Sequence, residues 1–269
     1  RKSIRKNYYP VETEILKGGE KMIIDAHAHL GYDTVFDEES TEANLLKYYN
    51  QYDVTGAIVQ PFINRPYIKD TKEIHDRIYQ FCQDYPDRFW GMASINPHFK
   101  PEDYEKEARR CINQLNFVGI KITPIAHAVH PGSRDGYHVF EVAQKLEVPV
   151  MVHTGAGIPF ADPASLFEVV KDFNSLKIIL AHSGSDLFFQ QALMLARKWD
   201  NVYLEPSWLS IINIRKILED IGPEKVMFSS DHALNVPVEL TKYRTLINDK
   251  NKLERVLSGT VREVFNLDW

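Results

Sequence analysis

The chain has 269 residues, of which 44% are hydrophobic and 26% charged, a balance typical of a globular enzyme with one large or two small domains. Its formal net charge of -5 argues against a nucleic-acid partner, which would favour a basic patch. No apolar run approaches the roughly 20 residues that span a bilayer, so we expect no membrane partner. The chain has only two cysteines, which fits free thiols and a cytoplasmic location, and neither lies in a Cys-x-x-Cys pattern, so we expect both to have a packing role.

Residues 1–21 are predicted to be an N-terminal extension outside the fold. They are charged, lack the apolar centre of a secretory signal, and end in Lys17-Gly18-Gly19-Glu20, which breaks any pattern before Met22. We expect residues 22–269 to form a single domain.

The first predicted strand, Ile23–His29, ends in two histidines separated by one residue. Successive side chains of a strand point to opposite faces, so His27 and His29 are expected to point the same way. Such a pair can bind one metal ion, or it can simply form hydrogen bonds at a strand end.

Further strands and helices then alternate along the chain. Strands are predicted at 56–61, 89–95, 117–122, 148–153, 177–182, 202–205 and 225–231, and helices at 41–52, 71–84, 101–115, 137–146, 163–173, 187–198, 211–221 and 251–265, with polar loops at 31–40 and 123–136. Continuous apolar strands are typical of a parallel sheet covered on both faces. Strand–helix units in this number predict an α/β fold, the TIM (β/α)8 barrel. An open doubly wound sheet is the alternative, but no Gly-x-Gly-x-x-Gly follows the first strand.

Chemistry in a TIM barrel takes place at the C-terminal ends of the strands. The residues at these predicted ends are His27, His29, Lys121, His153, His182 and Asp231. Because the candidate metal ligands and acid–base groups fall at one end of the barrel, we expect a metal site there.

Five short motifs carry a resemblance to a known family. They are Asp25-Ala26-His27-Ala28-His29, Gly119-Ile120-Lys121-Ile122, Val152-His153-Thr154-Gly155, Ala181-His182-Ser183-Gly184 and Ser230-Asp231-His232. In this order they resemble the amidohydrolase superfamily, and within it the amidohydrolase-related (amidohydrolase 2) group of TIM-barrel enzymes. The resemblance extends from Met22 to the end of the chain. It implies a metal-dependent hydrolase, or a member of the branch of non-oxidative decarboxylases.

The resemblance and the chemistry together suggest a role for each residue. His27, His29 and His153 would bind one divalent metal ion as neutral imidazoles, with Asp231 as a further ligand or as a hydrogen-bond partner of the metal-bound water. His182, together with Asp231, would act in acid–base catalysis. Zinc is the expected metal, with manganese or iron as alternatives. Lys121 could bind a substrate carboxylate, pair with Glu205, or bridge two metals in carboxylated form.

The expected partner is a small-molecule substrate, which could be a carboxylate, and we also expect a homodimer. Arg65 and Arg134 follow the second and fourth strands and could bind a carboxylate in a bidentate manner, or could be solvated. We expect His75 and His98 on the surface, and His127, His130 and His138 in or after a solvated loop, from which one of them could touch the substrate. His232 is expected to point away from Asp231 and either to support the site from behind or to be structural.

Two reactions fit these residues. The first is hydrolysis of a small amide, ester or lactone by a metal-activated water. The alternative is non-oxidative decarboxylation of a small aromatic or enoic acid with the same ligands. A barrel that binds a ligand without turnover is the third candidate, but it would lack a metal ligand, and none is missing. The DNase-like branch usually carries a glutamate at the end of the fourth strand, where this chain has Lys121, which argues against a nuclease.

Overall fold

The computed structural model describes residues 22–34, 36–63, 66–155 and 160–267. The predicted extension at residues 1–21 and the candidate Arg65 lie outside the described residues. Within these ranges, no helix has both the length and the apolar character to cross a membrane.

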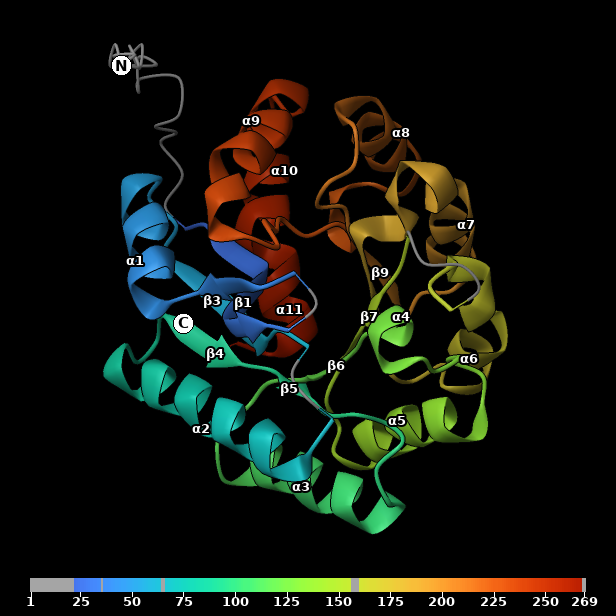
Figure 1. The fold of residues 1–269 in the computed structure, drawn as a ribbon. Helices are drawn as coiled ribbons and strands as arrows, with labels where there is room; N and C mark the ends of the chain where they lie inside the picture. Colours follow the sequence, from blue (N-terminus) through green and yellow to red (C-terminus); the bar gives the residue numbers. More distant parts are fainter. Residues whose placement is uncertain (1–21, 35, 64–65, 156–159, 268–269) are drawn as a thin grey trace, which may run out of the picture.

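The strands form the wall of a TIM barrel (Figure 1). They are β1 (Ile24–Asp33), β2 (Glu38–Ser40), β3 (Gly56–Pro61), β4 (Phe89–Gly91), β5 (Ala93–Ser94), β6 (Ile120–Ile122), β7 (Val150–His153), β8 (Ile178–Ala181) and β9 (Val202–Glu205). Their order is β2-β1-β3-β4 and β5-β6-β7-β8-β9, and every pair except β1–β2 is parallel. The Met92 N–H donates to the Val59 carbonyl at 2.8 Å, where β4 passes into β5.

The predicted strand 225–231 is extended but pairs irregularly. It meets β9 at the bridge between Leu204 and Val226, and β1 at the bridge between Ala28 and Asp231. These two parallel bridges close the barrel between its last and first strands. This closure also brings Asp231, at the end of the last strand, to the histidines of β1.

Helices surround the strands (Figure 1). They are α1 (Glu42–Gln51), α2 (Ile68–Asp84), α3 (Pro101–Asn113), α4 (Pro124–His127), α5 (Arg134–Lys145), α6 (Phe167–Asp172), α7 (Ser185–Lys198), α8 (Ile211–Ile221), α9 (Val236–Leu246), α10 (Lys250–Glu254) and α11 (Thr260–Phe265), with short turns η2 (Pro163–Leu166), η3 (His182–Gly184), η4 (Pro223–Lys225), η5 (Ala233–Asn235) and a π turn, η6 (Arg255–Gly259). Local sequence explains their starts. The hydroxyls of Thr41 and Ser133 cap α1 and α5, and Pro101 opens α3.

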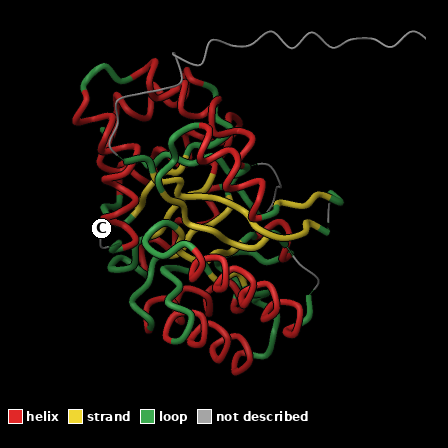
Figure 2. Tube along the Cα trace, turned by 90° about the vertical axis from the view of Figure 1, so that its left-hand side faces the viewer, coloured by secondary structure: helices red, strands yellow, loops and turns green. Residues whose placement is uncertain are grey.

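Two predicted loops contain regular structure. Residues 31–33 of β1 and 38–40 of β2 form an antiparallel pair, in which Gly31 pairs with Ser40 and Asp33 with Glu38. This antiparallel pair projects beyond the other strands (Figure 2). The predicted loop 123–136 contains α4 and the start of α5. Helix α9 has no counterpart among the predicted helices. Short segments without a long apolar period carry too little sequence signal to be recognised as helices.

Side chains of the barrel interior fix which strand residues face inward. The interior cluster contains Ile24, Ala26, Ile58, Met92, Met151, Ile179, Ala181 and Met227. Because strand side chains alternate, His153 on β7 points inward two residues after Met151. A larger apolar core fills the space between strands and helices. Polar residues such as His153 and His182 follow the interior cluster at the C-terminal ends of the strands.

Strand β1 departs from simple alternation. Its register against β3 shifts between Asp25 and Ala28, which is the mark of a bulge. Because of this extra residue, Ala26 belongs to the interior cluster and His27 also faces the site. Asp25 is buried and accepts hydrogen bonds from Tyr49 OH at 2.9 Å and from the Ser230 N–H at 3.0 Å. The carboxylate thus fastens β1 to the last strand of the barrel.

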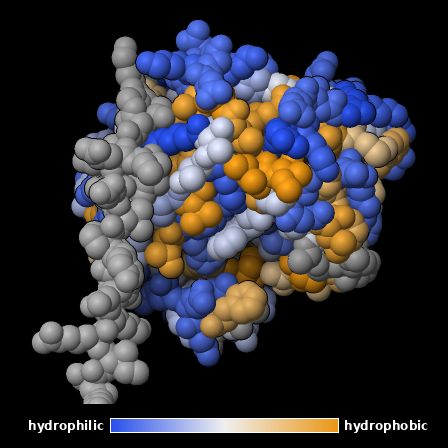
Figure 3. All heavy atoms as spheres, turned by 90° about the horizontal axis from the view of Figure 1, so that it is seen from above, coloured by the Kyte–Doolittle hydropathy of each residue, from blue (hydrophilic) through white to orange (hydrophobic). Residues whose placement is uncertain are grey.

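Hydrophobic side chains also reach the outer surface. Figure 3 views the molecule over α8, α9 and α10 and shows them interspersed among charged residues. Ile212 of α8 and Val238 of α9 are among the exposed hydrophobic residues. Isolated exposed apolar residues are ordinary on protein surfaces.

Candidate metal centre

Three donor atoms meet at the C-terminal end of the barrel. His27 Nε2 lies 3.0 Å from His29 Nε2, and Asp231 Oδ1 lies 3.2 Å from each of these nitrogens. A tetrahedral zinc site with bonds of ~2.0–2.1 Å places its ligand atoms ~3.3 Å apart. The three separations therefore suit a single divalent ion.

Hydrogen bonds fix the tautomers of both histidines. His29 Nδ1 lies 3.1 Å from the carbonyl oxygen of Pro61, which can only accept, so Nδ1 carries the proton. His27 Nδ1 donates to the Glu205 carboxylate at 2.7 Å. Burial lowers the pKa of both imidazoles, that of His27 to about 3 with a further contribution from Lys121, so both rings are neutral. Two lone pairs and a carboxylate oxygen then face one another, and this donor set fits a cation.

Glu205, at the end of β9, organises the residues behind the donors. Its Oε2 accepts from His27 Nδ1 and from the His182 N–H at 3.2 Å. Its Oε1 accepts from the Ser207 N–H at 2.7 Å and from the Ser229 hydroxyl. Burial opposes ionisation, but the interactions with His27 and Ser229 prevail and lower the pKa of Glu205 to about 2. Such a partner orients a metal-binding imidazole and raises its basicity.

His153 and His182 lie beside the three donors. Their rings are 4.8 Å apart, and the His182 ring is 5.1 Å from that of His27. His182 Nδ1 is 2.8 Å from the Ser207 hydroxyl, which leaves Nε2 as the nitrogen that can exchange a proton. Burial and the neighbouring His182 hold the pKa of His153 well below its ordinary value, so the ring is neutral, the form that binds a metal.

Lys121 occupies the centre of the site. It is 2% exposed, and its Nζ lies 2.9 Å from His27 Nε2, whose lone pair can serve either the ammonium or a metal ion. Burial lowers its pKa to about 8. Its direct neighbour is therefore the candidate ligand His27, rather than the Glu205 carboxylate that was one of its expected partners.

A pocket of about 450 Å³ opens onto these residues. His29, Lys121, His153, His182, Asp231 and His232 line it on the polar side, and Phe36, Phe62, Ile63, Ile125 and Ala126 on the apolar side, with Asp33, Glu38 and Thr123 completing it. Phe62 stacks on the His29 ring with 4.5 Å between centroids and 11° between planes. The wall beside the metal ligands is thus flat and apolar.

The structure corrects the expectation for His232. Asp231 has a left-handed backbone, with φ of 64°, and this breaks the alternation that would turn the next side chain away. His232 therefore lines the pocket and lies 5.5 Å from the Phe62 ring.

His75 and His127 were wrongly expected to be solvated. His75 is fully buried on α2, donates from Nδ1 to Glu107 at 2.8 Å and accepts the Ser94 N–H at 3.1 Å. Cys111 lies in the same cluster and, like Cys82, is a free thiol. Because these groups already pair with one another, the cluster acts as a structural link between α2, β5 and α3. His127 is buried in α4, and burial lowers its pKa to about 4.

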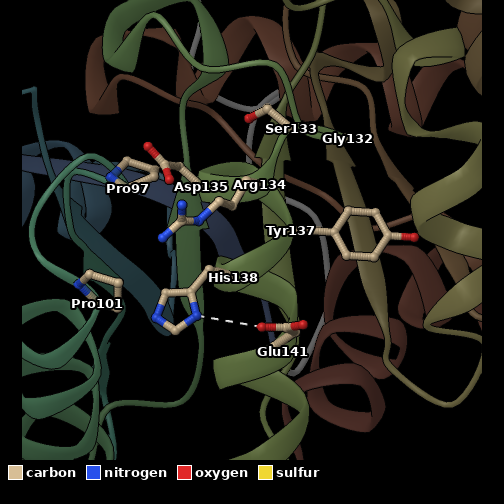
Figure 4. A pocket seen from close by; sticks show the side chains of 9 residues that line it. All are labelled: Pro97, Pro101, Gly132, Ser133, Arg134, Asp135, Tyr137, His138 and Glu141. Atoms are coloured by element: carbon tan, nitrogen blue, oxygen red, sulfur yellow. Dashed lines mark ion pairs between the residues drawn. The ribbon is translucent and has the colours of Figure 1, made fainter.

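Arg134 does not reach the donor atoms. It lines a separate pocket of about 560 Å³ between the starts of α3 and α5, together with Asp135, His138 and Glu141 (Figure 4). It is therefore not a ligand for a substrate held at the histidine cluster. The second arginine candidate, Arg65, lies outside the described residues.

Residues 24–267 match the sequence model of the amidohydrolase family, and the chain belongs to this family. One curated relative is 2-keto-4-carboxy-3-hexenedioate hydratase from Sphingobium sp. (strain NBRC 103272 / SYK-6), which is 24% identical over 188 residues. That alignment covers 57% of this chain and 55% of the hydratase, so the chain spans about half the length of the relative.

Solved structures share the fold. 2,6-Dihydroxybenzoate decarboxylase from Rhizobium has a TM-score of 0.75 and 16% identity, with 94% of this chain and 100% of that chain covered. 5-Carboxyvanillate decarboxylase from Sphingomonas paucimobilis has a TM-score of 0.71 and 15% identity, covering 92% and 99%. A dihydroxybenzoic acid decarboxylase from Polaromonas sp. JS666, with bound manganese and 2-nitroresorcinol, has a TM-score of 0.75 and 15% identity, covering 91% and 97%.

Proposed function

We propose that the protein is a metal-dependent lyase that decarboxylates a small, planar aromatic or enoic acid without a redox cofactor. The observation that carries the proposal is the convergence of His27 Nε2, His29 Nε2 and Asp231 Oδ1 beside a flat apolar wall. Decarboxylases among the structural relatives support this reaction over the hydrolysis first expected from the sequence. They share only 15–16% identity with this chain, so their substrates enter as candidates.

The metal would be held by His27, His29 and Asp231, with His153 as a further ligand. Zinc suits imidazoles combined with a carboxylate, and manganese is bound in the Polaromonas enzyme. When bound, the ion would supply the positive charge that polarises substrate oxygens. A carboxylated Lys121 that bridges two ions stays a prediction.

Residues of the pocket would perform the remaining work. Phe62 and Ile125 would hold a planar substrate by apolar contact, and Lys121 would pair with its carboxylate. His182, anchored at Nδ1 by Ser207, would deliver a proton from Nε2 to the carbon that bears the carboxylate. The carbon–carbon bond then breaks, its electron pair returns to the π system of the substrate, and neutral CO2 leaves. The apolar wall favours a step in which the charge of the carboxylate is lost.

Hydration of an enoic acid is the second candidate. The hydratase relative favours it, and the same His182 could move the proton that accompanies addition of water across a double bond. Hydration consumes water and releases no CO2, so the products separate the two reactions.

A substrate panel tests the proposal. Protein reconstituted with Mn²⁺ or Zn²⁺ is incubated with 2,6-dihydroxybenzoate, 5-carboxyvanillate, 2-keto-4-carboxy-3-hexenedioate, and a set of lactones, esters and amides. Released CO2 is measured with a coupled assay and products by NMR, with His182→Asn as the inactive control. We expect at least one of the three named acids to release CO2. Hydrolysis of a lactone, ester or amide without CO2 from any acid would overturn the decarboxylase proposal.

A further inference from the structure

Trp208 makes an unusual contact with the candidate ligand Asp231. It follows β9, and its indole Nε1–H donates to Asp231 Oδ2 at 2.8 Å. The other oxygen, Oδ1, is the one that lies 3.2 Å from both His27 Nε2 and His29 Nε2. The two carboxylate oxygens therefore have separate tasks, one toward the histidines and one toward the indole.

The backbone at both residues is strained. Trp208 has φ of 67° and Asp231 φ of 64°, in the left-handed region. This region is unfavourable for a residue with a side chain, and such residues persist only where the surroundings hold them in place. Strain of this kind gathers at functional sites, and here two strained residues hydrogen-bond to each other.

A buried network holds the Trp208 backbone. The Trp208 N–H donates to Glu239 Oε1 at 3.0 Å, and Lys242 Nζ and Asn235 Nδ2 donate to the same oxygen at 2.7 and 3.1 Å. Asn235 Nδ2 also donates to the Ser230 carbonyl at 3.2 Å. The contacts form a closed path, because Ser230 precedes Asp231, whose carboxylate accepts from the indole. The loop after β9 and the loop after the last strand are thereby tied together around Asp231.

The exposure of Trp208 argues against a packing role. The residue is 53% exposed, whereas a tryptophan retained for apolar contact would bury most of its large ring. Its ring meets the ring of His232 edge to face, with 6.1 Å between centroids.

We infer that Trp208 is a positioning residue whose indole N–H holds the outer oxygen of Asp231, so that the carboxylate presents a single oxygen to the metal. This inference rests on the metal centre proposed above. Hydrogen-bond partners behind metal ligands are worth roughly 10- to 100-fold in metal affinity. The indole N–H is such a partner, supplied by a residue outside the family motifs.

The test compares Trp208→Phe with Trp199→Phe. Phenylalanine keeps an aromatic ring at position 208 and removes the N–H. Trp199 packs its ring on Phe167 away from the metal centre, so its replacement is a matched control. Full-length protein is stripped with a chelator, its unfolding temperature is recorded, and Mn²⁺ is titrated by calorimetry. We expect Trp208→Phe to weaken Mn²⁺ binding about tenfold, while the stripped protein unfolds within a few degrees of the wild type and Trp199→Phe binds normally.

Two results would overturn the inference. One is an equal Mn²⁺ affinity in Trp208→Phe and the wild type. The other is a large loss of stability in the stripped Trp208→Phe protein, which would assign Trp208 to the fold. Absence of Mn²⁺ binding by the wild type would instead contradict the metal centre itself, so the two failures are distinguishable.

Discussion

Glu205 offers a sharp test of how the site is organised, through the replacement Glu205→Gln. The new side chain has the same shape but one of its ends becomes an NH2 group. Either end faces a backbone N–H that cannot turn, that of Ser207 at 2.7 Å or that of His182 at 3.2 Å. At least one buried donor is then unpaired, at a cost of about 1–3 kcal/mol. The charge-assisted bond from His27 is weakened or lost, for a further ~1.5–3 kcal/mol.

Together these effects should destabilise the metal-free protein by about 2.5–6 kcal/mol. For a chain of this size 1 kcal/mol corresponds to roughly 2–4 °C, so Tm should fall by about 5–24 °C. An NH2 group facing His27 would also favour the tautomer with its proton on Nε2, and metal affinity should fall 10- to 100-fold.

The assay is calorimetric unfolding of chelator-treated protein, followed by metal titration. Glu219→Gln is the control, because Glu219 is an exposed residue of α8 with a single weak ion pair to Arg215 at 3.8 Å. Its effect should stay below about 1 kcal/mol. If Glu205→Gln matched this control in both Tm and metal affinity, the account of Glu205 as the organiser of the site would be refuted.

Three further variants test the neighbouring groups. His182→Asn should keep metal affinity within a few-fold and lower kcat by roughly 10²–10⁴-fold, because it removes the proposed proton donor; loss of the metal would make His182 a ligand instead. Lys121→Met should raise the KM for carboxylate substrates about tenfold while one metal per chain remains, as expected when one charge-assisted contact worth ~1.5 kcal/mol is removed; a drop from two metals to one would support the carboxylated bridge. Glu107→Gln should cost about 1–3 kcal/mol, because it removes the buried carboxylate that accepts from His75, whereas Arg110 keeps its ion pair with Asp76. Burial acts to raise the pKa of Glu107, but His75 and Arg110 outweigh burial and lower the pKa from 4.5 to about 2. The ionised carboxylate therefore stabilises the fold above pH 4.5, and this stabilisation is lost as the pH falls toward 2. Urea unfolding between pH 5 and 2.5 should therefore show a smaller loss for Glu107→Gln than for the wild type; equal losses would contradict this role.

The barrel could be predicted because its strands are continuous apolar runs of the length a covered parallel sheet requires. The same logic located Lys121, His153 and His182, since strand ends of a TIM barrel share one face. Glu205 also ends a predicted strand, so the same rule could have placed it in the site, although we expected it only as a partner of Lys121. Its buried position between His27, Ser207 and Ser229 could not be inferred from spacing alone.

Other features lie beyond local sequence patterns. The bulge in β1 arises from pairing with β3 and from the hydrogen bonds of Asp25 to Tyr49 and Ser230, which are distant in the sequence. The orientation of His232 depends on the left-handed backbone of Asp231. A glycine would have been a sequence signal for this backbone conformation, but the residue is an aspartate.

His75 is different, because its burial had a signal in the sequence. It falls on the helical stripe of α2 formed by Thr71, Ile74, Ile78, Phe81 and Cys82, all of which are buried. A histidine on an apolar stripe is expected to be buried and paired. Helical spacing was therefore a better guide to this residue than its polar character.

The most direct measurement is the metal stoichiometry of the full chain and of His27→Ala, by elemental analysis after reconstitution with Zn²⁺ or Mn²⁺ and by calorimetric titration of the stripped protein. We expect one ion per chain in the wild type. We expect at least a hundredfold weaker binding in His27→Ala, because one of the converging donors and its link to Glu205 are removed. Unchanged binding in His27→Ala, or no binding by the wild type, would contradict the proposal that these histidines and Asp231 form a metal centre.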